Sequence, residues 1–120
     1  MLLTIFQMFV QELGYEVAGA TGSGEEALEV VENCPDISCV LMDIQLDGNM
    51  DGIATAREMA GRIKAPVILT SGLNDPALVK DAVMENVYGF LTKPLYRQNL
   101  GITIEYACAK YALDNGGRRD

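Results

Sequence analysis

The stretch ISCVLMD, from Ile37 to Asp43, decides the fold. Apart from Ser38 it is apolar up to Met42, and a carboxylate follows directly. An apolar run of this length is typical of a parallel strand that is covered on both faces. We therefore predict a central strand over Ile37–Met42, with Asp43 at its carboxyl end.

Two further segments downstream repeat this pattern. The range Pro66–Thr70 has an apolar centre and is followed by the hydroxyl of Ser71. The range Tyr88–Thr92 is shorter, and Lys93 and Pro94 break it. Both ranges are predicted strands, and each is followed by a polar side chain that can take part in a reaction.

Segments with helical spacing of apolar residues separate the strands. We predict helices over Met1–Leu13, Gly24–Asn33, Asp51–Arg62, from the Asn74-Asp75-Pro76 start to about Asn86, and over Arg97–Leu113, with a short strand at Tyr15–Ala20. Strands joined through helices cannot form hairpins, so they lie parallel with right-handed crossovers. The fold class is predicted to be doubly wound α/β, a parallel sheet with helices on both faces.

Polar side chains follow each of the three buried strands: Asp43, then Thr70 with Ser71, then Lys93. In a parallel sheet of this kind, ligands bind outside the carboxyl ends of the strands. A carboxylate there can act as a nucleophile towards phosphorus, while a hydroxyl and an ammonium can contact phosphoryl oxygens. The spacing therefore predicts a site for a phosphoryl group.

Composition and charge exclude several classes of function. The 120 residues are enough for one sizeable core and too few for two. A net charge of −8 disfavours direct binding to nucleic acid or to an anionic membrane surface. The chain has no histidine, which excludes imidazole bases and Ser-His-Asp or Cys-His catalysis.

The three cysteines, Cys34, Cys39 and Cys108, are odd in number and lack C-x-x-C spacing. We interpret them as small core residues of a protein in a reducing compartment. Residues 1–11 have neither the length of a membrane span nor the flanks of a secretory signal. The expected localisation is cytoplasmic.

Three motifs carry a resemblance to a known family: VLMDIQL at 40–46 with MDG at 50–52, PVILTSG at 66–72, and YGFLTKPL at 88–95. Together they resemble the receiver domain of two-component response regulators, the CheY-like family, over nearly the whole chain. The resemblance implies a flavodoxin-like fold. It also implies a function in phosphorelay signalling, in which a sensor histidine kinase supplies a phosphoryl group and a partner-binding face then switches.

The resemblance also implies roles for individual residues. Asp43 corresponds to the phosphoacceptor, Thr70 to the switch hydroxyl, Lys93 to the phosphoryl-binding lysine and Phe90 to the switch aromatic. The metal is Mg²⁺, held by Asp43 and by the backbone carbonyl of Gln45. Taken alone, Phe90 is equally well explained as a core residue.

Further implications concern the remainder of the chain. A cis peptide is expected before Pro94, and the face spanning Pro76 to Leu113 is expected to dock a partner or a second copy. Residues 1–114 would form the receiver domain, and 115–120 a tail or the start of a linker. Such a domain is not a conventional enzyme: at most it phosphorylates itself from small donors and dephosphorylates itself.

The sequence departs from the family pattern at its N-terminal end. Receivers begin with a strand that ends in two adjacent acidic residues, whereas these 120 residues start in the helix that follows that strand. Three explanations are open: upstream residues are absent, the Tyr15–Ala20 strand moves inward, or another chain supplies the missing edge. Without the acidic pair, Mg²⁺ binding is expected to be weak.

A calcium-binding loop is a second, less favoured interpretation. Asp47, Asn49, Asp51, Gly52 and Glu58 fit the spacing D-x-[DN]-x-[DN]-G-x5-E. An EF-hand loop requires a preceding helix, however, and a buried strand is predicted there. The alternative is a polar loop that enters a helix.

The run Gly22–Ala27 (GSGEEA) resembles a dinucleotide-binding turn that opens a helix. Glu25 and Glu26 occupy the position that a pyrophosphate would need, so these glycines are better explained as turn formers.

The strongest alternative to a phosphate-accepting receiver is a receiver-like interaction module that never takes phosphate, because the acidic pair is missing.

Overall fold

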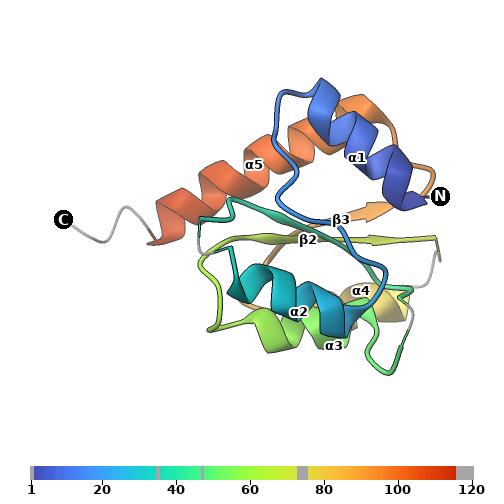
Figure 1. Ribbon diagram of the computed structural model, residues 1–120, viewed down its shortest axis with the longest axis vertical. Helices are drawn as coiled ribbons and strands as arrows, with labels where there is room; N and C mark the ends of the chain where they lie inside the picture. The colour runs from blue at the N-terminus through green and yellow to red at the C-terminus, as the bar shows by residue number, and fades with distance from the viewer. Residues whose placement is uncertain (1, 35, 47, 73–75, 116–120) are drawn as a thin grey trace.

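The computed structural model describes residues 2–34, 36–46, 48–72 and 76–115. Helices and strands alternate along most of this part of the chain (Figure 1). The helices are α1 (Leu2–Glu12), α2 (Gly24–Glu32), α3 (Gly52–Met59), α4 (Pro76–Ala82) and α5 (Arg97–Asn115). The strands are β1 (Val40–Asp43), β2 (Val67–Ser71) and β3 (Val87–Thr92).

The three strands form one parallel sheet in the order β1-β2-β3. The central strand β2 is buried at all of its residues, as its apolar sequence predicts. Asp43 on β1 is in register with Thr70 on β2, and Thr70 is in register with Leu91 on β3. The predicted doubly wound α/β fold is confirmed.

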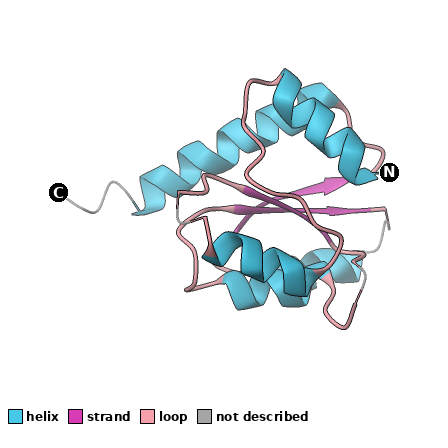
Figure 2. Ribbon diagram, viewed as in Figure 1, coloured by secondary structure: helices cyan, strands magenta, loops and turns pink. Residues whose placement is uncertain are grey.

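Helices cover both faces of the sheet, as Figure 2 shows in cyan and magenta. One face carries α1 and α5, and Ile68 from β2 packs there with Leu100 and Ile104 from α5. The other face carries α2, α3 and α4, and Val67 and Leu69 from β2 point into that core. Successive residues of β2 thus serve opposite cores, as the alternation of side chains along a strand requires.

The predicted strand at Tyr15–Ala20 is wrong, because that segment forms no strand. A strand needs a neighbour to pair with, and in the described part of the chain β1 pairs only with β2. The segment passes beside the sheet without joining it, and Ala18, Gly19 and Ala20 are exposed (Figure 1). Local sequence indicated an extended backbone, but it could not show whether a pairing partner was present.

Several element boundaries also differ from the predictions. The first strand starts at Val40 instead of Ile37, and α3 ends at Met59 instead of Arg62. Helix α4 ends at Ala82, four residues before the predicted end. Met1, Asn74, Asp75 and the end of the predicted tail, 116–120, lie outside the described residues.

The starts of α2 and α3 account for the two competing motifs. The Ser23 hydroxyl accepts a hydrogen bond from the Glu26 N–H at 3.2 Å and so caps α2. Asp51 caps α3 in the same way, because its Oδ1 accepts from the Ala54 N–H at 2.8 Å. These residues of the dinucleotide-like and calcium-like patterns therefore serve as helix caps.

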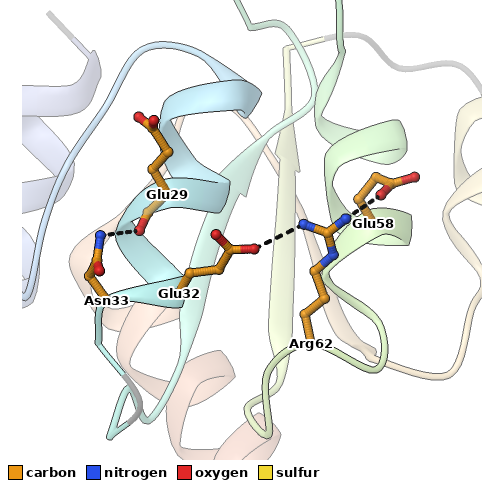
Figure 3. Close-up of polar contacts among 5 residues, drawn as sticks. All are labelled: Glu29, Glu32, Asn33, Glu58 and Arg62. Carbon is orange, nitrogen blue, oxygen red and sulfur yellow. Dashed lines mark hydrogen bonds and ion pairs between the residues drawn. The ribbon is translucent and has the colours of Figure 1, made fainter.

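Arg62 links the ends of α2 and α3, and Figure 3 shows it between two carboxylates. Its guanidinium contacts Glu32 on α2 and Glu58 on α3, at 3.1 Å each. Glu58, the last residue of the calcium-like pattern, is thus occupied by an ion pair, while Asp47 lies outside the described residues. All three side chains are about half exposed, so these pairs stabilise the fold only slightly.

None of the helices described is both long and apolar enough to cross a membrane.

Gly52 permits α3 to start directly behind β1. A Cβ at this position would lie 2.1 Å from the carbonyl oxygen of Asp43 and 2.7 Å from the Cα of Ile44. The Gly52 N–H also donates to the Ile44 carbonyl at 2.9 Å. This close approach is the physical reason for glycine in the MDG motif.

We predict that Gly52→Ala lowers the free energy of unfolding by about 1–3 kcal/mol, because the added methyl group meets rigid backbone. Denaturant unfolding followed by circular dichroism measures this change. Gly101→Ala in α5 is the control, since its methyl group meets only the end of the Leu13 side chain and alanine favours a helix. Equal losses in both variants would contradict the backbone explanation.

Candidate functional site

The carboxyl ends of the three strands bring Asp43, Thr70 and Lys93 to one edge of the sheet. Asp43 ends β1, Thr70 lies near the end of β2, and Lys93 directly follows β3. Backbone hydrogen bonds fix the connections that leave this edge: Ile44 N–H donates to Thr70 O, and Lys93 N–H donates to Ser71 O, both at 2.8 Å. The sequence prediction that these side chains share one edge is therefore met by the register of the strands.

The carboxylate of Asp43 has two partners. Its Oδ2 forms an ion pair with the ammonium of Lys93, and its Oδ1 accepts a hydrogen bond from the Gln45 N–H at 2.9 Å. The Asp43 and Lys93 side chains are only 17% and 14% exposed, so water screens this pair less than it screens a surface pair. The site thus holds one anion and one cation in direct contact.

The hydroxyl of Thr70 is fully buried, and no partner for its Oγ1 is found among the residues that the structure describes. Burying a hydroxyl without a hydrogen bond costs free energy. A buried polar atom of this kind calls for an explanation, and here it lies at the strand end beside the Asp43–Lys93 pair. Its role as a switch hydroxyl stays a prediction.

The Gln45 side chain is part of the site, although sequence reasoning considered only its backbone carbonyl. Its Nε2 donates to Ser71 Oγ at 3.4 Å, and its Oε1 accepts from the Gly72 N–H at 3.3 Å. Gln45 thereby ties the loop after β1 to the end of β2. The signal in the sequence was an amide side chain two residues after the carboxylate, which by itself does not reveal its partners.

Phe90 and Pro94 complete the set of residues singled out from the sequence. The Phe90 side chain is partly buried and packs against the core on the α2, α3 and α4 face, which agrees with its interpretation as a core residue. Its role as a switch stays a prediction. The Lys93–Pro94 peptide is cis, as expected.

The cysteines lie away from this chemistry. Burial raises the pKa of the Cys39 thiol to about 12, so it stays protonated at neutral pH. Burial also raises the pKa of Cys108. Thiols with a raised pKa are poor nucleophiles at neutral pH. Cys39 and Cys108 are partly buried and pack against the core on the α1 and α5 face, which agrees with their interpretation as small core residues.

The described residues do not fit a Mg²⁺ site. Mg²⁺ favours octahedral coordination by oxygen, often from one or two carboxylates. The structure has no cluster of three or more potential metal-ligating Asp, Glu, Cys or His side chains in the residues it describes. The carboxylate that is present, Asp43, is already paired with Lys93.

The sequence matches the family model of the response regulator receiver domain over residues 1–105. The chain belongs to this receiver family. It is 33% identical over 103 residues to the transcriptional regulatory protein PdtaR of Mycobacterium tuberculosis, covering 85% of this chain and 49% of that protein. It is 36% identical over 87 residues to the chemotaxis protein CheY of Thermotoga maritima, covering 71% of this chain and 70% of that protein.

The receiver fold is also found among solved structures. The signal receiver domain of a modulated diguanylate cyclase from Desulfovibrio desulfuricans G20 superimposes with a TM-score of 0.85 at 30% identity, covering 94% of this chain and 89% of that one. A receiver domain protein from Clostridium thermocellum gives a TM-score of 0.83 at 27% identity, covering 93% and 89%.

Membership places the chain among response regulator receivers, consistent with two-component signalling. Receivers interact with sensor histidine kinases and generally bind Mg²⁺ at an acidic pocket. The chain spans about half the length of PdtaR, so the receiver is one part of that relative.

We predict that Thr70→Val raises the free energy of unfolding by about 1 kcal/mol, because valine has the same shape without the unpaired hydroxyl. Thermal and urea unfolding measure this change. Thr55→Val is the matched control: Thr55 is equally buried, but its hydroxyl donates to Asp51 O at 2.7 Å, so that variant should lose about 1 kcal/mol. A Thr70→Val variant as destabilised as the control would show that the hydroxyl has a partner.

Proposed function

We propose that this receiver domain accepts a phosphoryl group on Asp43 from a sensor histidine kinase and then changes a partner-binding face. The observation that carries the proposal is the contact between Asp43 and Lys93 beside the buried hydroxyl of Thr70. The contact supports the proposed roles of Asp43 as nucleophile and Lys93 as counter-charge, with Thr70 at the neighbouring strand end as the proposed donor. The cytoplasm, where such kinases present their phosphohistidine, is the proposed location.

In the proposed reaction, a carboxylate oxygen of Asp43 attacks the phosphorus of a phosphohistidine. The P–O bond forms, the P–N bond breaks, and the histidine imidazole leaves with the electron pair. The product is an acyl phosphate on Asp43. Lys93 then exchanges its contact with the carboxylate for one with the phosphoryl oxygens, and Thr70 donates to another of them.

The exchange of partners links the site to the face between Pro76 and Leu113. We propose that Thr70 and Phe90, the aromatic side chain on β3, act as the switch residues that the family resemblance implies. This range carries large exposed apolar side chains on α4, directly after it and on α5, namely Val79, Val83, Ile102, Tyr106 and Leu113. Exposed apolar groups of this kind suit docking of a protein partner or a second copy. The net charge of −8 argues against direct contact of this domain with nucleic acid or membrane.

The proposed receiver unit is residues 1–114, with 115–120 as a tail or the start of a linker. Its own chemistry is limited to self-phosphorylation from small donors such as acetyl phosphate and to hydrolysis of the acyl phosphate. Because the described donors do not fit Mg²⁺, we propose that this chain binds the metal weakly.

A second function is a receiver-like interaction module that never takes phosphate. The observation in its favour is that the described residues hold no group of three or more Asp, Glu, Cys or His side chains that could bind a metal. The same phosphorylation experiment separates the two functions.

We predict that Asp43→Asn abolishes phosphorylation. The wild-type chain incubated with acetyl phosphate and Mg²⁺ should gain the mass of one phosphoryl group, and hydroxylamine should remove it. The control is Asp51→Asn, because asparagine preserves the α3 cap and leaves Asp43 in place. Labelling of the Asp43→Asn variant at the wild-type level would refute the assignment, and an unlabelled wild type would favour the second function.

We predict that Lys93→Ala keeps the fold while weakening the coupling between phosphorylation and the rest of the domain, because the phosphoryl group loses its counter-charge. Circular dichroism checks the fold, and the change in tyrosine emission on phosphorylation reports the coupling. Lys80→Ala on the exposed surface of α4 is the control. An unfolded Lys93→Ala variant would instead assign the lysine a structural role.

We predict weak Mg²⁺ binding by these 120 residues and correspondingly slow phosphorylation. The chain has no tryptophan, so tyrosine emission can follow a Mg²⁺ titration. A version extended at its N-terminus by a strand that ends in two acidic residues should gain in both respects. Tight binding and fast phosphorylation without the extension would mean that Asp47, Asp51 or a neighbouring subunit supplies the ligands.

A further inference from the structure

Two of the three cysteines meet between α5 and the start of β1. Cys39 directly precedes β1, and Cys108 lies within α5. The Cys108 thiol donates to the carbonyl oxygen of Ser38, the neighbour of Cys39, at 3.8 Å. The Cys39 thiol in turn donates a hydrogen bond to the sulfur of Cys108. The two sulfur atoms are therefore in contact, although Cys108 and Ser38 are 70 residues apart in the sequence.

The pair lies at the margin of the core, where a small molecule can reach it. Both side chains are only partly buried, and both pack against the core on the α1 and α5 face. Both also line one cavity of about 490 Å³. Because a single water molecule needs only about 15 Å³ of such space, a small peroxide has room to approach the two sulfur atoms.

The hydrogen bond between the thiols gives them different roles. Burial raises the pKa of both, to about 12 for Cys39. The bond donated by Cys39 lowers the pKa of Cys108, whose thiolate accepts it, and raises that of Cys39 further. Cys108 is thus the first of the two to ionise, and the thiolate is the form that attacks an oxidant. Burial keeps this thiolate scarce at neutral pH, so the pair responds to sustained oxidation.

We propose that Cys39 and Cys108 form a reversible disulfide, with hydrogen peroxide as the oxidant. The Cys108 thiolate attacks one peroxide oxygen, the O–O bond breaks, and the hydroxide that leaves takes up a proton to give water. The Cys39 sulfur then attacks the sulfenic acid on Cys108. The S–S bond forms, the S–O bond breaks, and the second hydroxide leaves as water with the Cys39 proton. Two thiols are oxidised and one peroxide is reduced.

The disulfide ties α5 to the strand that carries Asp43. Helix α5 packs against β2 and β3, and the new bond adds a covalent link from this helix to the start of β1. Because α5 belongs to the face between Pro76 and Leu113, the oxidised form holds that face fixed against the sheet. This consequence rests on the proposed function, whereas formation of the disulfide does not. Disulfides in reducing compartments are usually transient and redox-sensing, which suits a link that reductants remove.

The test counts free thiols in the 120-residue chain before and after treatment with hydrogen peroxide. After unfolding, N-ethylmaleimide should label all three cysteines of the reduced chain but only Cys34 of the treated chain, and dithiothreitol should restore the other two labels. A protease that cleaves before aspartate separates Cys34 from Cys39 at Asp36, so the cross-linked peptides identify the partners. The melting temperature of the oxidised chain should rise by roughly 5 °C or more, because the bond closes a long loop.

Three variants test the assignment of roles. Cys34→Ser is the control, and it should form the same link as the wild type. In Cys39→Ser, peroxide should leave Cys108 as a sulfenic acid that dimedone captures, with no disulfide. Cys108→Ser should give neither the disulfide nor a comparable yield of captured sulfenic acid. Circular dichroism checks that each variant is folded, and for a variant that is not, the peptide map of Cys34→Ser decides.

Three outcomes would overturn the proposal. Three labels on the peroxide-treated wild type would show that the pair does not oxidise. A link that involves Cys34, or one that joins two chains, would show that the contact between Cys39 and Cys108 does not direct the reaction. Capture by dimedone on Cys39 in Cys108→Ser, without capture on Cys108 in Cys39→Ser, would refute the order of attack.

Discussion

The parallel pairing of β2 with a strand on each side is the constraint on which the rest of the structure depends. Because β2 is buried along its whole length, its backbone groups must be satisfied within the sheet. Its first three side chains are apolar and pack into the cores on both faces. Helices therefore cover both faces, and the connections between strands are crossovers. Parallel strands end on the same side, so every polar residue that terminates a strand arrives at one edge. The direction of the strands alone therefore brings these polar residues together, whatever contacts their side chains make.

At the carboxyl edge of the sheet, a negatively charged side chain forms an ion pair with a positively charged one. Asp43 and Lys93 come from strands that are not neighbours, and their side chains meet across the end of β2. Both side chains are largely buried, so water screens their attraction less than it screens a surface pair. Behind them, Gly52 allows α3 to start against the carbonyl of Asp43, and Gln45 ties the following loop to β2. The Asp43 carboxylate is therefore positioned by β1 itself, by the loop that follows β1 and by Lys93, which follows β3.

Much of this arrangement could be predicted from the sequence, and the failures have a common cause. The apolar runs around Val40 and Val67 identify buried strands because burial on both faces leaves a local compositional signature. The strand at Tyr15–Ala20 was predicted from the same kind of local signal and is absent, because pairing requires a neighbour that local sequence does not describe. The Gln45 side chain was overlooked for the same reason: its partners lie 26 and 27 residues away. Local composition indicates whether a residue is buried, whereas its strand-pairing and hydrogen-bonding partners depend on the tertiary structure.

The proposed phosphorylation changes the charge balance of the site. The Asp43–Lys93 pair sums to zero, and phosphorylation adds roughly 1.5 to 2 negative charges at neutral pH. Lys93 alone cannot balance both the phosphoryl group and the remaining field of a chain with a net charge of −8. The buried hydroxyl of Thr70 and the Gln45 N–H are the neutral donors that can share this charge. A metal would relieve this charge further, but the described residues hold no group of three or more side chains that could bind one. The neutral donors and Lys93 therefore carry the charge balance of the proposed phosphorylated state.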